Sequence, residues 1–415
     1  MVLCAALIAC VGVVLAIGTP PPNTASYANG DLRDYPDAPR VAWTVSEASL
    51  PGYGGAETGP DVIDTWRDQW LVSYPSGLGR AVMLIDRLTG DPLWDAPIVM
   101  GLGDCDFTST GQIGCAIKLG SAPDGFYIVD DTGALGEATD LDDTAKVTGV
   151  GPNFLRIDQS GYRATMRTST GRQLWSRTFA ASASAKVSDG TLIITTTDGR
   201  QFAVNPDTGR DRVSCSACAI TSYPTGIAVQ YNASTEEKVE TFASSGGVVN
   251  LPAVSSSDGL RVIGGPSTLP VLTGTGGQMT EETQGRYEVR NPANPTALWQ
   301  VSDSELSKVN AKACGALLIL ALKDGSRVVK RLIDGSTVGD LPAASYDQPD
   351  ANIDYLDCVG SSGSTSVFAN ANQVTAFDAA TGRIAWTRSI VGSARNVDGF
   401  VTLREGSTLT VLQPG

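Results

Sequence analysis

Apolar and polar residues alternate along most of the chain, and the clearest example is the stretch from Val374 to Trp386. An alternating run leads into a turn at Asp378–Gly382, and a short second run ends at the tryptophan. Period-two alternation is typical of β-strands, and glycine suits the turn because it adopts positive φ without a Cβ penalty. The stretch therefore predicts a β-hairpin. One hairpin alone is only marginally stable in water, so it needs partners.

The same hairpin pattern recurs, which makes the chain a repeat protein. Complete or partial copies lie at 82–94, 126–135, 164–175, 202–213, 239–248, 287–299 and 330–338. The turn and tryptophan positions that define the repeat are Asp86, Gly90, Trp94, Gly171, Trp175, Gly209, Trp299, Asp378, Gly382 and Trp386. Successive repeats end roughly 40–50 residues apart, the interval of a four-stranded propeller blade.

The two ends of the repeat region predict a closed ring. Residues 41–45, which include Trp43, form a strand with no partner before it, and residues 399–404 and 408–412 form strands with no outer partner after them. Joining them completes one blade and removes an open sheet edge. No stretch has the period of a long amphipathic helix. We therefore expect an all-β, single β-propeller over residues 41–415. Because one weak repeat could be spurious, we expect eight blades, within a range of seven to nine.

The N-terminal residues 1–18 are almost wholly apolar and uncharged from Val2 onward. About 17 to 20 such residues can span a bilayer. We expect a transmembrane anchor, with a cleaved signal peptide and a lipoprotein modified at Cys10 as the alternatives. Residues 19–40 are rich in proline and polar residues and predict a linker. Each of the three alternatives places the propeller outside the cytoplasmic membrane.

Six cysteines lie in the propeller region, an even number. Cys105 and Cys115 are placed to face each other across a hairpin. Cys314 and Cys358 are about one blade apart, and Cys215 and Cys218 form a Cys-x-x-Cys motif without a second motif or a histidine to complete a zinc site. Three structural disulfides in an oxidising compartment are the simplest interpretation.

The chain contains no histidine, which excludes His-activated nucleophiles and His-ligated metal sites. No nucleophile elbow, phosphate loop or dinucleotide fingerprint is present, so we predict no catalytic residue, metal or cofactor. The net charge of −14 argues against nucleic acid as a partner. Trp66 and Trp70 lie outside the repeat position of tryptophan. They predict either core packing or an exposed recognition patch.

The hairpin Val374–Trp386 and its copies resemble the repeat of pyrroloquinoline-quinone-type propellers, a group that includes quinoprotein dehydrogenases and BamB-like envelope lipoproteins. In the dehydrogenases, adjacent cysteines, a calcium-binding carboxylate set and a catalytic Asp accompany the repeat. This chain has no adjacent cysteines and no acid that matches the catalytic one. The resemblance therefore favours the BamB-like branch over the dehydrogenases.

This resemblance implies a non-enzymatic, membrane-anchored scaffold in a bacterial cell envelope, whose partner is another envelope protein. The alternatives are a module that binds a small ligand or glycan in the central channel and, less favoured, a quinone-dependent oxidoreductase. A fold shared by many activities does not decide between them.

Overall fold

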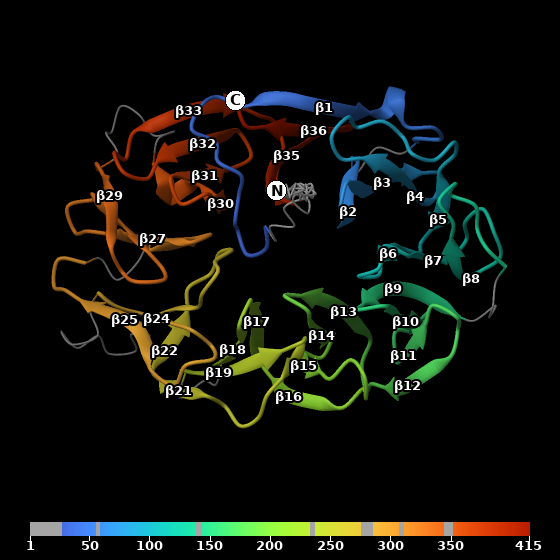
Figure 1. The fold of residues 1–415 in the computed structure, drawn as a ribbon, viewed down its shortest axis with the longest axis horizontal. Helices are drawn as coiled ribbons and strands as arrows, with labels where there is room; N and C mark the ends of the chain where they lie inside the picture. The colour runs from blue at the N-terminus through green and yellow to red at the C-terminus, as the bar shows by residue number, and fades with distance from the viewer. Residues whose placement is uncertain are drawn as a thin grey trace, which may run out of the picture.

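The computed structural model describes residues 27–54, 59–137, 143–232, 237–274, 285–306, 311–343 and 352–415. Within these residues the chain forms nine antiparallel sheets arranged as a ring around a central channel (Figure 1). The regular helices in this part of the chain are short 3-10 turns, η1 (Glu47–Ser49) and η4 (Ile353–Tyr355). The fold is an all-β propeller, as the alternation predicts.

We number the blades from the one that joins the two ends of the propeller, and give the innermost strand first. Blade 1 contains β34 (Ser393–Val397), β35 (Phe400–Glu405), β36 (Thr408–Gln413) and β1 (Arg40–Ser46). Blade 2 contains β2 (Asp61–Trp66), β3 (Gln69–Ser76), β4 (Gly79–Asp86) and β5 (Ile98–Gly101). Blade 3 contains β6 (Cys105–Phe107), β7 (Ile113–Ile117) and β8 (Gly125–Val129). Blade 4 contains β9 (Thr144–Val150), β10 (Asn153–Asp158), β11 (Arg163–Thr168) and β12 (Gln173–Thr178).

The remaining five blades complete the ring. Blade 5 contains β13 (Ala183–Ser188), β14 (Thr191–Thr196), β15 (Arg200–Val204) and β16 (Asp211–Ser216). Blade 6 contains β17 (Cys218–Tyr223), β18 (Gly226–Asn232), β19 (Glu237–Ser245), β20 (Val248–Val249) and β21 (Ser255–Asp258). Blade 7 contains β22 (Leu260–Val262), β23 (Val271–Gly274), β24 (Arg286–Arg290) and β25 (Ala297–Ser302). Blade 8 contains β26 (Lys312–Cys314), β27 (Leu317–Ala321), β28 (Arg327–Arg331) and β29 (Thr337–Leu341), and blade 9 contains β30 (Asp357–Ser361), β31 (Thr365–Ala369), β32 (Gln373–Asp378) and β33 (Ile384–Ser389).

The ring closes as predicted, but the expected number of eight blades is wrong. β1 pairs antiparallel with β36, from Arg40 opposite Gln413 to Ser46 opposite Thr408. The described residues form nine sheets because each weak repeat, including the short unit around 126–135, builds a sheet of its own. In blade 3 the described residues form three strands, β6, β7 and β8.

The repeated turn and the repeated tryptophan lock neighbouring blades together. Trp43 of blade 1 lies on the turn glycine Gly90 of blade 2, where an added Cβ would come within 2.7 Å of the indole. The Trp43 Nε1 donates to the carbonyl of Arg87 at 2.6 Å. The same indole-on-glycine contact joins Trp66 to Gly111, Trp94 to Gly133, Trp175 to Gly209 and Trp299 to Gly335. Each of these turns therefore closes its own hairpin and also packs against a tryptophan of the preceding blade.

The other repeat residues keep the turns in shape. Asp86 accepts hydrogen bonds from the backbone N–H groups of Leu88 and Thr89, and Asp378 accepts from that of Thr381. Such Asx bonds satisfy backbone donors inside a tight turn. Gly171 and Gly382 have φ of 87° and 67°, a region that favours glycine. Trp386 of blade 9 contacts the segment before β1 instead, and its Nε1 donates to the carbonyl of Tyr35 at 2.9 Å.

The three predicted disulfides are present. Cys105–Cys115 joins β6 and β7 within blade 3, and Cys215–Cys218 spans the crossing from blade 5 to blade 6. Cys314–Cys358 joins the innermost strands β26 and β30 of neighbouring blades, as their separation of 44 residues predicts. Two of the three bonds therefore hold one blade to the next.

Residues 27–39, which we call the strap, are packed against the propeller, so the expected free linker does not describe this part of the chain. In Figure 1 the strap is the blue segment that runs from the rim beside β1 to the middle of the ring. Backbone hydrogen bonds join Leu32 N to Ser361 O at 3.0 Å and Arg33 N to Gly399 O at 3.1 Å. The polar, proline-containing composition that suggests a linker also suits a segment whose backbone bonds to the blades it crosses.

Side chains fix the strap on one face of the ring. Tyr35 is fully buried, and its hydroxyl donates to Leu412 O at 2.7 Å and accepts from Val401 N at 3.0 Å. Asn29 donates to Asp189 at 2.7 Å, which connects the strap to blade 5. We call this the strap face; it carries the turns between the first and second strands of each blade. The opposite face, with the turns between second and third strands, is the open face.

The predicted membrane anchor, residues 1–18, lies outside the described residues, as do Cys4 and Cys10. Among the residues that are described, no helix has the length and apolar character needed to cross a membrane.

Candidate functional site

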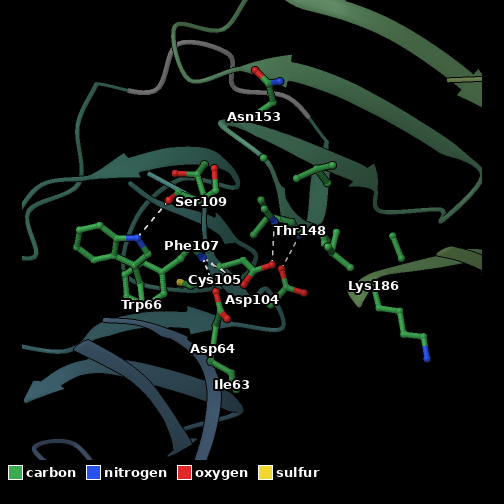
Figure 2. A pocket seen from close by; sticks show the side chains of 18 of the residues that line it. Ile63, Asp64, Trp66, Asp104, Cys105, Phe107, Ser109, Thr148, Asn153 and Lys186 are labelled. Atoms are coloured by element: carbon green, nitrogen blue, oxygen red, sulfur yellow. Dashed lines mark hydrogen bonds between the residues drawn. The ribbon is translucent and has the colours of Figure 1, made fainter. Parts of the chain in front are cut away.

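A cavity of about 920 Å³ lies on one side of the central channel. Its wall is formed by the innermost strands β2, β6, β9 and β13, with turns from blades 5 and 6 at its edge. Figure 2 shows Trp66, Asp64 and Asp104 on this wall, with Lys186 at one side. The channel is therefore not filled by side chains on this side, and polar groups line the space.

Three carboxyl groups, Asp64, Asp104 and Asp106, stand on this wall, and each is tied to the next blade. Asp64 of β2 accepts from the backbone N–H of Phe107 in β6 at 2.8 Å. Asp104, just before β6, and Asp106 in β6 accept from Val147 N at 2.6 Å and Gly149 N at 2.8 Å, both in β9. These bonds replace the backbone partners that the innermost strands, at a sheet edge, would otherwise lack.

The surroundings of two of these carboxyl groups raise their pKa values. Burial raises the pKa of Asp104 to about 7, and the Val147 N–H and the Lys146 charge oppose this only partly. Burial also raises the pKa of Asp106, and the neighbouring Asp64 carboxyl raises it further by a shared hydrogen bond and by charge repulsion. Two close carboxyl groups cannot both ionise cheaply, so the proximity of Asp64 favours the protonated form of Asp106.

Replacing Asp104 with asparagine should make folding less sensitive to pH. The pKa of Asp104 rises from 3.8 to about 7 on folding, so its stabilising protonated state is lost as the pH rises through 7. Asparagine keeps the oxygen that accepts from Val147 and has no charge to bury. We expect D104N to exceed the wild-type free energy of unfolding at pH 8 by on the order of 3 kcal/mol, and to match it at pH 4.

The measurement is urea unfolding at pH 4, 6 and 8, and Asp130→Asn is the matched control. The pKa of Asp130 is lowered by hydrogen bonds from Thr132 and from the backbone of Ala134. The stability of that variant relative to wild type should stay nearly constant from pH 4 to pH 8, because a carboxyl group with a lowered pKa is already largely ionised at pH 4 in both the folded and the unfolded chain. A D104N advantage that is equal at pH 4 and pH 8 would contradict burial of an ionising carboxyl group.

Trp70 does not belong to a recognition patch, contrary to one of the two interpretations of this residue. It is fully buried and meets the rings of Trp43 and Phe400 edge-on, with centroids 5.6 and 6.0 Å apart. Trp66 is partly exposed on the cavity wall, and its Nε1 donates to Ser109 O at 3.3 Å. The two tryptophans thus point to opposite sides of blade 2.

The three carboxyl groups were not among the residues predicted from the sequence to form a site. A signal was present: Asp104-Cys105-Asp106-Phe107 alternates, so a buried cysteine and phenylalanine on one side place both acids on the other. Asp64 has no such signal, because its proximity to Asp106 depends on how blades 2 and 3 meet. Within the described residues, no group of three or more Asp, Glu, His or Cys side chains is arranged to hold a metal ion.

No protein-family model and no curated protein sequence matches this chain. Solved structures do resemble it. BamB from Moraxella catarrhalis has 13% identity and a TM-score of 0.42, with 91% of this chain and 98% of that chain covered. Quinohemoprotein alcohol dehydrogenase from Comamonas testosteroni has 11% identity and a TM-score of 0.40, with coverage of 90% and 76%. The computationally designed Ika8 protein has 14% identity and a TM-score of 0.42, with coverage of 89% and 99%. At these identities the likeness concerns the fold alone.

Proposed function

We propose that this protein is a membrane-anchored scaffold of the BamB-like kind, which presents the turns of a rigid propeller to another protein of a bacterial cell envelope. The observation that carries the proposal is the position of the most exposed large apolar side chains. They lie on turns and connections at the ends of the blades: Leu78, Leu119, Ile333, Tyr355 and Val391. Exposed apolar groups on a rigid frame suit recognition, since little has to be ordered on binding.

Three further features support an extracytoplasmic location. Residues 2–17 are apolar and uncharged, three disulfides stabilise the blades, and the net charge of −14 disfavours nucleic acid. Disulfides persist in oxidising compartments. The channel carboxyl groups serve as acceptors between blades, which supports a scaffold over a carboxylate-based enzyme. Binding of a small ligand or glycan in the channel stays an alternative prediction, and the cavity beside Trp66 is its expected location.

Membrane anchoring can be tested by fractionation of cells that express the full chain. We expect the protein to stay in the membrane pellet after alkaline carbonate extraction and to be digested by protease added to spheroplasts. Val13→Lys with Leu15→Lys should release it, because each lysine in the middle of a spanning helix costs about 3 kcal/mol. Thr24→Lys with Ser26→Lys, outside the apolar run, is the control and should stay in the pellet. Release of the unaltered chain by carbonate would refute the anchor.

A further inference from the structure

Three exposed leucines lie on adjacent turns at the open face of the ring. Leu78, Leu102 and Leu119 have exposed fractions of 101%, 59% and 71%, and we call them the leucine cluster. Together they expose more surface than two free leucine residues would. A single exposed leucine is ordinary, but contiguous exposed apolar groups mark interaction surfaces.

Backbone contacts bring together the three turns that carry these leucines, although the turns are separate in the sequence. In blade 2, Arg80 pairs with Gly101, so the turn with Leu78 and the residue before Leu102 meet at the same end of the sheet. Leu102 N donates to Lys118 O at 2.8 Å, which brings in the residue before Leu119 from blade 3. The cluster therefore crosses the junction between two blades.

Glycines make this close approach possible. A Cβ on Gly79 would come within 2.2 Å of Gly101 O, and a Cβ on Gly101 would come within 2.0 Å of Lys118 O. Real Cβ atoms do not tolerate such distances, so larger residues would push the turns apart. The backbones of the three turns therefore pack directly against one another, and the neighbouring leucine side chains face solvent.

Leu119 is in a backbone conformation that leucine disfavours. Its φ is 58°, in the left-handed region that favours glycine or asparagine. Its N–H donates to Asp124 Oδ1 at 2.8 Å, which helps to hold this conformation. A bulky apolar residue that is both exposed and in a disfavoured conformation gains nothing for the isolated fold. Such outliers are concentrated at functional positions.

The end of the described chain indicates which way the cluster faces. Tyr27 lies on the strap face, where its ring packs on Gly399 and its carbonyl accepts from Asn396 Nδ2 at 3.4 Å. The eight residues from 19 to 26 can span at most about 30 Å to the predicted anchor. If residues 1–18 are anchored in a membrane, the strap face is the side near the membrane and the leucine cluster points away from it.

In this orientation neither membrane lipid nor a second copy of the chain can occupy the leucine cluster, which leaves a different protein. Membrane lipid lies on the opposite side of the ring from the cluster. In a symmetric pair of copies joined through the leucine cluster, the strap faces would point in opposite directions, so both anchors could not enter one membrane. We propose, relying on the anchored orientation of the proposed function, that the leucine cluster docks an apolar segment of a different protein exported to the same side of the membrane.

Site-specific crosslinking in intact cells tests this proposal with the full chain. A photoreactive amino acid at position 102 should form an adduct with a different polypeptide, and mass spectrometry should map the adduct to an apolar peptide of that protein. Leu78→Ser with Leu119→Gly should reduce the adduct at least tenfold. Leu119→Gly suits the positive φ, so this variant should keep the wild-type melting temperature. Purified full chain carrying both substitutions should also bind the isolated partner at least tenfold more weakly.

Leu88 provides the matched control. Like Leu78 and Leu102, it is an exposed leucine of blade 2, with an exposed fraction of 60%, but it lies on the strap face. Leu88→Ser should leave the adduct at position 102 unchanged. An adduct only with a second copy, only with lipid, or one that survives the double substitution would overturn the proposal, as would no adduct. Carbonate extraction of the same cells separates the two claims: release from the membrane with an intact adduct refutes the anchor and leaves the docking site standing.

Discussion

Replacing Trp70 with alanine should lower the free energy of unfolding by about 4 kcal/mol. Trp70 is fully buried and packs against Trp43 and Phe400, both of blade 1, so its side chain fills the junction at which the ring closes. Truncation removes a large apolar group and leaves a cavity that the surrounding sheets cannot collapse to fill. Urea unfolding followed by tryptophan fluorescence and by far-UV circular dichroism measures the change.

Two matched variants separate burial from the loss of any tryptophan. Trp70→Phe keeps an aromatic ring in the same place and should cost less than half as much. Trp66→Ala removes the partly exposed tryptophan of the same blade and should cost about 1–2 kcal/mol, because less apolar surface returns to water. Equal losses for Trp70→Ala and Trp66→Ala would contradict the position of Trp70 in the core.

Removing the disulfide between Cys314 and Cys358 should destabilise the protein by about 4 kcal/mol. The bond closes a loop with a sequence separation of 44 and joins the innermost strands of blades 8 and 9. Without it, the unfolded chain gains conformational freedom that the folded ring does not. Cys314→Ala with Cys358→Ala keeps both positions apolar, and denaturant midpoints under oxidising conditions give the loss.

The disulfide between Cys105 and Cys115 is the internal comparison. Its sequence separation is 10, and both cysteines belong to blade 3. The chain-entropy argument predicts a smaller loss, about 3 kcal/mol, for the corresponding alanine pair. If this pair proved more important than Cys314–Cys358, loop entropy would not be the dominant contribution of these bonds.

Much of the fold could be predicted because each blade is specified by a local pattern. In the hairpin Val374–Trp386, alternation predicts the two strands and Gly382 predicts the turn between them. The two strands are present where expected, as β32 and β33. The pairing of β1 with β36 followed from the need to leave no sheet edge open. The number of blades was underestimated because one weak repeat was treated as spurious, whereas the weak repeats also form sheets.

The candidate site was less predictable because its residues meet across blades. Asp64 and Asp106 belong to different repeats, and only the packing of β2 against β6 makes one raise the pKa of the other. Residues 27–39 have the composition of a linker, yet their backbone bonds to blades 1 and 9 hold them on the strap face. Composition does not report bonds to distant backbone.

The sequence by itself determined the repeating hairpin and the closed ring, because both depend on periodicity, and its cysteine spacings favoured the three disulfide pairs that the structure then showed. Only the tertiary structure decided the number of blades, the contact between Asp64 and Asp106, and the meeting of Leu78, Leu102 and Leu119. Alternation fixes which side of a strand a side chain occupies. Which turns then come together depends on how closely the backbones of different repeats approach each other. A pattern within one repeat does not determine the distance between two repeats.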